Sequence, residues 1–104
     1  MSGDEDVRAQ DSGLVVEGKP YSQQILGSTI LREFSGDVDP DDLEWHQDER
    51  DRQVRVIEGN GWLLQFDAAL PSELVDGRTY CVPAKTWHRV IRGGGRLVVE
   101  IVES

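Results

Sequence analysis

The chain contains two histidines, His46 and His88, and both lie where their side chains could share one metal ion. Asp48 follows His46 by two residues, and alternate residues of an extended strand point to the same face, so these two side chains can converge. His88, from a distant strand, would supply a second imidazole. Two imidazoles and one carboxylate form a ligand set that suits Fe(II), and also Zn, Mn or Ni. The spacing therefore predicts a divalent metal site at His46, Asp48 and His88.

Arg52 shares the face of Asp48 if the strand stays regular, and its guanidinium is permanently cationic and has no lone pair for a metal. Three interpretations follow: Arg52 repels a cation, forms a bidentate ion pair with Asp48, or binds an anionic substrate such as a carboxylate or phosphate. A strand irregularity would instead turn Asp51 inward as a fourth ligand. The alternative to all of these is that residues 46–52 form a solvated, charged strand end and that His88 is satisfied by hydrogen bonds.

The bulk properties of the chain exclude several classes of function. With 104 residues there is room for one domain with one modest core. The formal net charge of −9 disfavours a nucleic-acid partner and would repel an anionic membrane. No apolar run reaches the roughly 20 residues of a membrane helix and no signal-peptide pattern opens the chain, so we expect a cytoplasmic protein. The single cysteine, Cys81, lies within an apolar strand pattern that predicts a core position.

Short apolar segments alternate with turn signals along most of the chain. Residues 1–12 are polar and acidic, so we expect a disordered tail before a single domain of residues 13–104. The expected strands cover residues 25–34, 43–48, 53–58, 62–67, 78–82, 88–92 and 96–102. The tight turn Gly59-Asn60-Gly61 predicts that the strands on either side of it pair as a hairpin. Residues 37–42 predict a loop, and residues 70–74 a single helical turn. About eight such strands are typical of an all-β sandwich or barrel.

Strand parity assigns the side chains to faces. With the metal ligands inward, Val54 and Val56 point inward, and Arg55 and Ile57 point outward. The same rule places three apolar residues in the core, namely Trp62, Leu64 and Phe66. Trp87 and Ile91 point away from His88, and two outward apolar residues favour a homodimer interface. The alternative is that Trp87 only caps the edge of the sheet.

The two histidine segments resemble the two motifs of the cupin superfamily. In the first motif His46 takes the first His position, Asp48 the second, Arg52 the Glu position and Gly59 the final Gly. The second motif is matched in type and spacing by three residues, Gly77, Pro83 and His88, with Lys85 at its second Gly position and Arg92 where the motif often ends in Asn. The resemblance spans about residues 43–103.

This resemblance implies a double-stranded β-helix, a compact jelly-roll-like barrel with a metal inside one end. Cupins include dioxygenases, isomerases, epimerases, decarboxylases and metal-free binding or storage proteins, so the fold alone does not assign a reaction. The first hypothesis is a metal-dependent enzyme that acts on a small polar or anionic molecule, with Arg52 and Arg92 binding the anion and Tyr80 near enough to assist. A 2-oxoglutarate-dependent oxygenase, which shares this barrel, ranks lower because the chain lacks length for the elements that enclose the cosubstrate.

Two other hypotheses remain. The second is a metal-free small-molecule-binding module in which an Asp48–Arg52 pair replaces the metal. The third is an interaction subunit whose outward Trp87 and Ile91 surface matters more than its cavity.

Overall fold

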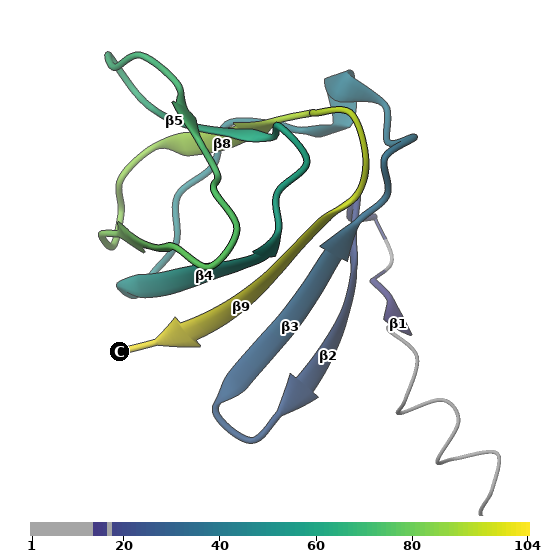
Figure 1. The fold of residues 1–104 in the computed structure, drawn as a ribbon. Helices are drawn as coiled ribbons and strands as arrows, with labels where there is room; N and C mark the ends of the chain where they lie inside the picture. The colour runs from purple at the N-terminus through teal and green to yellow at the C-terminus, as the bar shows by residue number, and fades with distance from the viewer. Residues whose placement is uncertain (1–13, 17) are drawn as a thin grey trace, which may run out of the picture.

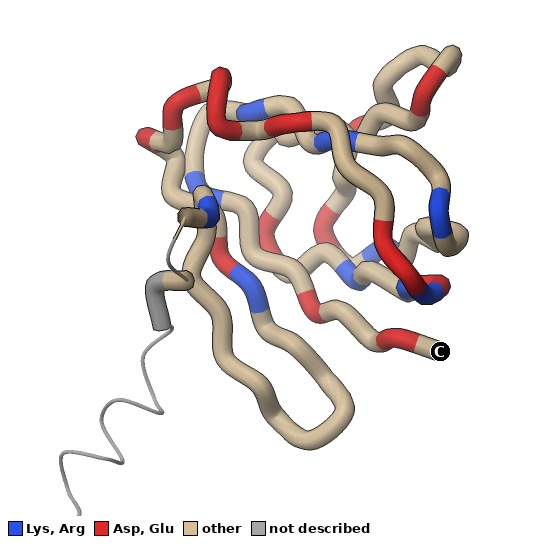
Figure 2. Tube along the Cα trace, turned by 180° about the vertical axis from the view of Figure 1, so that it is seen from behind, with Lys and Arg blue, Asp and Glu red and all other residues tan. Residues whose placement is uncertain are grey.

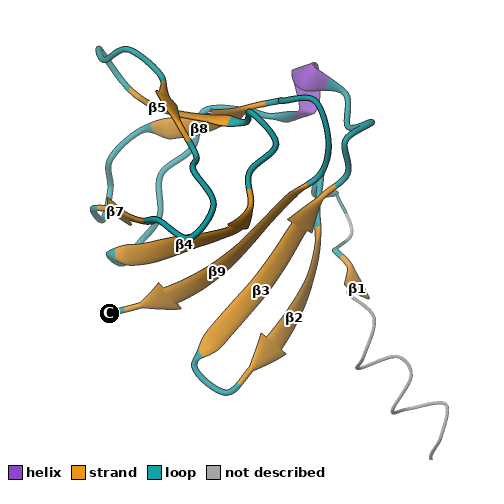
Figure 3. Cartoon of the chain, in the orientation of Figure 1, coloured by secondary structure: helices purple, strands orange, loops and turns teal. Residues whose placement is uncertain are grey.

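The computed structural model describes residues 14–16 and 18–104, and within them the regular secondary structure is β apart from one short helix. The elements are β1 (Leu14–Val15), β2 (Ser22–Leu26), β3 (Thr29–Phe34), the short 3-10 helix η1 (Pro40–Asp42), β4 (Arg52–Glu58), β5 (Leu63–Phe66), β6 (Ser72–Glu73), β7 (Thr79–Val82), β8 (His88–Ile91) and β9 (Leu97–Glu103). One sheet has the order β1-β2-β3-β9-β4-β7 and the other β6-β5-β8, and neighbouring strands are antiparallel. Figures 1 and 3 show these two layers. The all-β prediction is confirmed, and the predicted tail of residues 1–12 lies outside the described residues.

The core lies between the two sheets, and β9 supplies much of it from its central place between β3 and β4. Its inward residues alternate along the strand, as period-2 geometry requires. Leu97, Val99 and Ile101 are buried, and Val99 pairs with Val56, which is fully buried on β4. The predicted parity of β4 is confirmed, because Arg55 and Ile57 are exposed on its other face.

Trp62 joins the second sheet to this core. It is fully buried, its ring contacts Phe34, and its Nε1 donates a hydrogen bond to the Gly95 carbonyl at 2.6 Å. A buried indole N–H requires such an acceptor. Leu64 is buried and Phe66 packs against the same cluster, so the predicted inward set of this segment is confirmed.

The predicted hairpin around Gly59-Asn60-Gly61 is wrong. The turn exists, with φ of 48° at Asn60 and 81° at Gly61, but β4 pairs with β7 and β9 whereas β5 pairs with β6 and β8. A register irregularity between Val56 and Glu58 bends the end of β4, as bulges do. Gly59 then passes so close to the Leu74 carbonyl that a Cβ would overlap it. The turn therefore carries the chain from one sheet to the other.

Several local predictions also differ from the structure. The segment 25–34 is two strands, β2 and β3, separated by the turn Gly27-Ser28. Residues 70–74 contain the strand β6 instead of a helical turn, because Ser72 and Glu73 pair with β5. Residues 43–48 form only an isolated bridge, and η1 lies within the predicted loop with Asp39 as its N-cap.

Several polar and apolar side chains are exposed on the surface of the two sheets. Cys81 is exposed and not in the core. Trp87 points outward with 48% of its surface exposed, as expected, and the homodimer stays a prediction. Acidic positions are spread along the chain with Lys and Arg interspersed among them (Figure 2). Among the described residues, no helix is long and apolar enough to cross a membrane.

Candidate metal centre

An isolated β-bridge brings the two histidines together. The backbone N–H of His46 donates to the His88 carbonyl, and that of His88 donates to the His46 carbonyl, both at 2.9 Å. This reciprocal pair ties the segment before β4 to the start of β8. The imidazole rings consequently lie side by side, with their centroids 4.2 Å apart.

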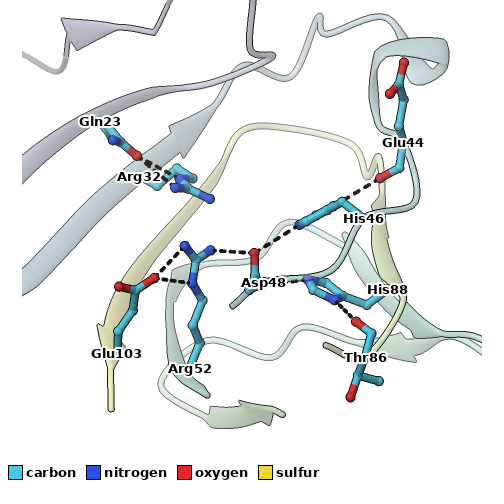
Figure 4. A network of polar contacts seen from close by, with 9 residues as sticks. All are labelled: Gln23, Arg32, Glu44, His46, Asp48, Arg52, Thr86, His88 and Glu103. Carbon is cyan, nitrogen blue, oxygen red and sulfur yellow. Dashed lines mark hydrogen bonds and ion pairs between the residues drawn. The ribbon is translucent and has the colours of Figure 1, made fainter. Parts of the chain in front are cut away.

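Asp48 completes the predicted group. One ligand atom each from His46, Asp48 and His88 lies within 4.8 Å of the others. The Nε2 atom of His46 is 3.9 Å from Oδ1 of Asp48, and the Nε2 atom of His88 is 3.4 Å from Oδ2 (Figure 4). The side chains of Asp48 and His88 are 11% and 7% exposed, whereas that of His46 is 50% exposed. The group therefore reaches from the interior to solvent.

Backbone carbonyls orient both imidazoles. The Nδ1 atom of His88 is 2.8 Å from the Thr86 carbonyl oxygen, and Nδ1 of His46 is 3.2 Å from that of Glu44. A carbonyl oxygen can only accept, so each Nδ1 carries the hydrogen. The lone pair of each neutral imidazole is then on Nε2, the atom that faces Asp48. Metal-binding histidines in proteins are commonly oriented by such a bond from the other ring nitrogen.

The electrostatics of this group fit a cation. Oδ2 of Asp48 is buried and has no hydrogen-bond partner among the described residues. It faces the Nε2 lone pair of His88, so two acceptors oppose each other at 3.4 Å. A proton on Nε2 would relieve this, but burial lowers the pKa of His88 and favours the neutral ring. Two lone pairs and a buried carboxylate oxygen directed at one point are the donor set of a divalent metal.

Arg52 contacts Asp48 but forms its shortest bonds with a different carboxylate. Its Nη1 is 3.4 Å from Oδ1 of Asp48, whereas Nε and Nη2 are 2.9 Å and 2.7 Å from Oε2 of Glu103. The register explains this, because Arg52 is directly opposite Glu103 in the pairing of β4 with β9. Glu103, which the sequence interpretation had not considered, holds the guanidinium to one side of Asp48. The predicted ion pair forms, without being bidentate.

The alternative with Asp51 as a fourth ligand does not form. Asp51 is exposed, and its Oδ1 accepts a hydrogen bond from the Ala84 backbone N–H at 2.7 Å. That contact secures the loop after β7 and leaves Asp51 outside the group of three ligands.

A cavity of about 790 Å³ lies between the two sheets next to this group. Its polar part includes His46, Asp48, Arg52 and His88, and apolar residues of both sheets form much of the remaining wall. Further charged or polar residues also line it, namely Lys19, Asp42, Glu44 and Gln47. Arg32 of β3 also lines it and is only 9% exposed. The sequence interpretation missed Arg32, although alternation already places it on the face of Ile30 and Phe34.

Tyr80 and Arg92, predicted to assist at the site, do not line this cavity. The Tyr80 hydroxyl donates to the Glu73 carbonyl at 2.8 Å and accepts from the Val75 N–H at 2.9 Å, which holds the β6 loop. Arg92 is exposed and its Nη1 donates to the Val38 carbonyl at 2.9 Å. The parity argument failed for Arg92 because β8 ends at Ile91.

Comparisons with solved structures identify the architecture. A cupin domain from Bordetella pertussis Tohama I is 24% identical, with 88% of this chain and 99% of that chain covered and a TM-score of 0.58. KdgF from Halomonas sp. is 20% identical over 88% of this chain and 86% of that chain, with a TM-score of 0.65. Fe(II) HppE is 17% identical over 81% of this chain, with a TM-score of 0.62.

The larger of these structures extend well beyond this chain, which spans 48% of the HppE chain and 36% of a chain from the DMSP lyases RdDddP and RnDddQII. No protein-family model and no curated protein matches the sequence. At these identities the likeness establishes the fold, and with it the architecture that the two histidine motifs predicted. The chain is a cupin-fold protein.

Proposed function

We propose that this protein binds one divalent metal ion through His46, Asp48 and His88, and that the ion acts on a small polar or anionic molecule held in the adjacent cavity. The ion belongs to the group Fe(II), Mn, Ni and Zn, all of which accept imidazole and carboxylate ligands. The HppE structure, whose fold is similar, contains Fe(II). That likeness supports a metal in a fold of this kind without choosing the ion.

One observation carries the proposal: the buried Oδ2 of Asp48 lacks a hydrogen-bond partner among the described residues and faces the lone pair of His88. Buried polar atoms in native structures nearly always have partners, so such an atom calls for an explanation. A cation between the three ligands would satisfy Oδ2 and both Nε2 atoms at once. Hydrogen bonds from Nδ1 to backbone carbonyls already orient both rings for this role.

A bound divalent ion would polarise a substrate oxygen as a Lewis acid. Residues of the chain supply the other features of the site, namely access from solvent, a positioned guanidinium and an apolar wall. The half-exposed His46 leaves the group reachable from solvent, and Glu103 keeps the guanidinium of Arg52 beside Asp48. Apolar cavity residues such as Leu64 and Val90 displace water around a small ligand, which strengthens polar contacts within the cavity.

Thermal unfolding with and without added ions tests the proposal. The chelator-treated protein should show a saturable rise in Tm with Fe(II), Mn, Ni or Zn under reducing conditions. An ion at a hundredfold excess over its Kd stabilises the native state by about 2.7 kcal/mol. Asp48→Asn should abolish the rise, because an amide is a poor metal ligand. The matched control is Asp51→Asn, a nearby carboxylate outside the ligand group, which should keep it.

A metal-free binding module is the competing function, and the contact of 3.4 Å between Arg52 and Asp48 favours it. In that case the guanidinium alone neutralises Asp48 and the cavity holds a small molecule without an ion. This alternative predicts a Tm that does not respond to any of the four ions, in the wild type as in Asp48→Asn.

A further inference from the structure

Arg32 is a buried cation in the wall of the cavity. It lies on the inward face of β3 between Ile30 and Phe34, and its partner on β9 is Val99. Only 9% of its surface is exposed. Charged side chains are rarely buried to this degree without a counter-ion, because water solvates them far better than an apolar environment does.

The contacts of Arg32 leave its charge unmatched. Its Nε and Nη2 both donate to Oε1 of Gln23, at 3.1 Å and 2.9 Å, and its guanidinium lies 3.9 Å from the centroid of the Tyr21 ring. Gln23 is neutral. Among residues 14–16 and 18–104 no carboxylate forms an ion pair with Arg32, although Asp42 and Glu44 also line the cavity.

Arg52 provides the contrast within the same cavity. It is matched by two carboxylates, those of Glu103 and Asp48. In Figure 4 the side chain of Arg32 extends from Gln23 toward Arg52 and the metal ligands. Burial lowers the pKa of Arg32 and the nearby Arg52 charge acts in the same direction, whereas Tyr21, Asp48 and Glu103 act against it. A guanidinium remains protonated at neutral pH. Arg32 therefore stays charged inside the cavity, and no carboxylate of the described residues lies within ion-pair distance of it.

We propose that Arg32 binds the carboxylate group of a small acid that occupies the cavity. Gln23 engages the Nε and Nη2 side of the guanidinium and leaves Nη1 as a donor toward the cavity. Lys19 also lines the cavity but is exposed, and Arg52 is paired with two carboxylates, so Arg32 is the buried cation without an ion pair among the described residues. A single such guanidinium suits a monoanion better than a phosphate, which carries nearly two charges at neutral pH. The inference deepens the proposed function by naming a substrate class. The inference rests on the proposed function only where the other end of the acid would contact the metal. The contact between its carboxylate and Arg32 requires no ion.

Paired acids and amides test this proposal. Acetate with acetamide, and benzoate with benzamide, would be titrated into chelator-treated protein and into metal-supplemented protein, with binding followed by two-dimensional NMR of the backbone amides. At least one carboxylate should bind saturably to the wild type, and at least tenfold more tightly than its amide. Arg32→Gln should weaken the carboxylate at least tenfold. Arg55→Gln, which removes an exposed arginine of β4 paired with Glu100, should leave binding unchanged.

The outcomes separate this inference from the proposed function. Equal binding of an acid and its amide, carboxylate binding that survives in Arg32→Gln, or no saturable carboxylate binding would overturn it. Inorganic phosphate that binds more tightly than both acids would overturn the assignment to a carboxylate. If Arg32→Gln does not fold, the carboxylate affinity of Arg32→Lys and the comparison of acid with amide in the wild type take its place as the test. Carboxylate binding that depends on Arg32 in a protein that takes up no metal would refute the proposed function and retain this inference.

Discussion

Replacing Arg32 with methionine should stabilise the ligand-free, metal-free protein. The variant loses two hydrogen bonds to Gln23, which share one acceptor oxygen and are counted together as about 1.5–3 kcal/mol for a charged donor. It also loses the contact with the Tyr21 ring, worth about 1 kcal/mol. It gains an apolar side chain in an apolar wall, about 1.5–3 kcal/mol, and no longer carries the desolvation cost of an ion without a counter-ion, several kcal/mol. The gains exceed the losses, and we expect the free energy of unfolding to rise by about 1 kcal/mol.

Urea and thermal unfolding measure this change, since 1 kcal/mol shifts Tm by roughly 4–8 °C in a domain of this size. Arg52→Met is the matched control. It leaves Glu103 and the buried Asp48 without their cation, and should lower the free energy of unfolding by about 1–3 kcal/mol after allowance for partial exposure. Loss of stability in Arg32→Met as large as in Arg52→Met would show that Arg32 has a structural counter-charge, and would refute the reasoning.

Three further predictions follow from the structure. Arg52→Gln should tighten metal binding about tenfold, or 1.4 kcal/mol, because the ion no longer competes with a guanidinium for Asp48; a competition titration against a chelator measures it, and weaker binding would contradict it. Burial holds the pKa of His88 below its ordinary value of 6.5, so the unfolded chain binds more protons as pH falls. The free energy of unfolding of the metal-free protein, measured in urea, should therefore decrease as the pH drops below 6.5, and it should decrease less steeply in His88→Gln. An equal dependence on pH in both proteins would contradict this prediction. Gly59→Ala should cost about 1–3 kcal/mol because its Cβ overlaps the Leu74 carbonyl, whereas Gly94→Ala, with its nearest atom 3.9 Å away, should leave the urea midpoint nearly unchanged.

The three candidate metal ligands could be predicted from sequence because two local rules coincide there. Period-2 spacing places His46 and Asp48 on one face, and the motif resemblance supplies His88 from a distant strand. The bridge between the two histidines satisfies both rules in the structure. Arg32 obeys the same alternation, but it lies outside both motifs, and sequence alone does not show that its neighbours on β9 are apolar and offer no carboxylate.

The errors arise where long-range pairing overrides local signals. The Gly59-Asn60-Gly61 turn has the expected positive φ values, but its conformation does not determine which sheet receives the next strand. By alternation along the sequence Arg92 would share the face of His88, but β8 ends at Ile91, so the alternation does not extend to Arg92. The partner of Arg52 is set by the register of β9, which brings Glu103 opposite it and is invisible in the local sequence.

The central claim is that His46, Asp48 and His88 hold a metal ion, and elemental analysis by mass spectrometry tests it most directly. Tag-free protein, purified without chelator and supplemented with divalent ions under reducing conditions, would be measured beside His88→Ala and Asp51→Asn. We predict close to one equivalent of a single divalent metal in the wild type and in Asp51→Asn, and its loss in His88→Ala. Metal-free wild-type protein, or full metal content in His88→Ala, would contradict the claim.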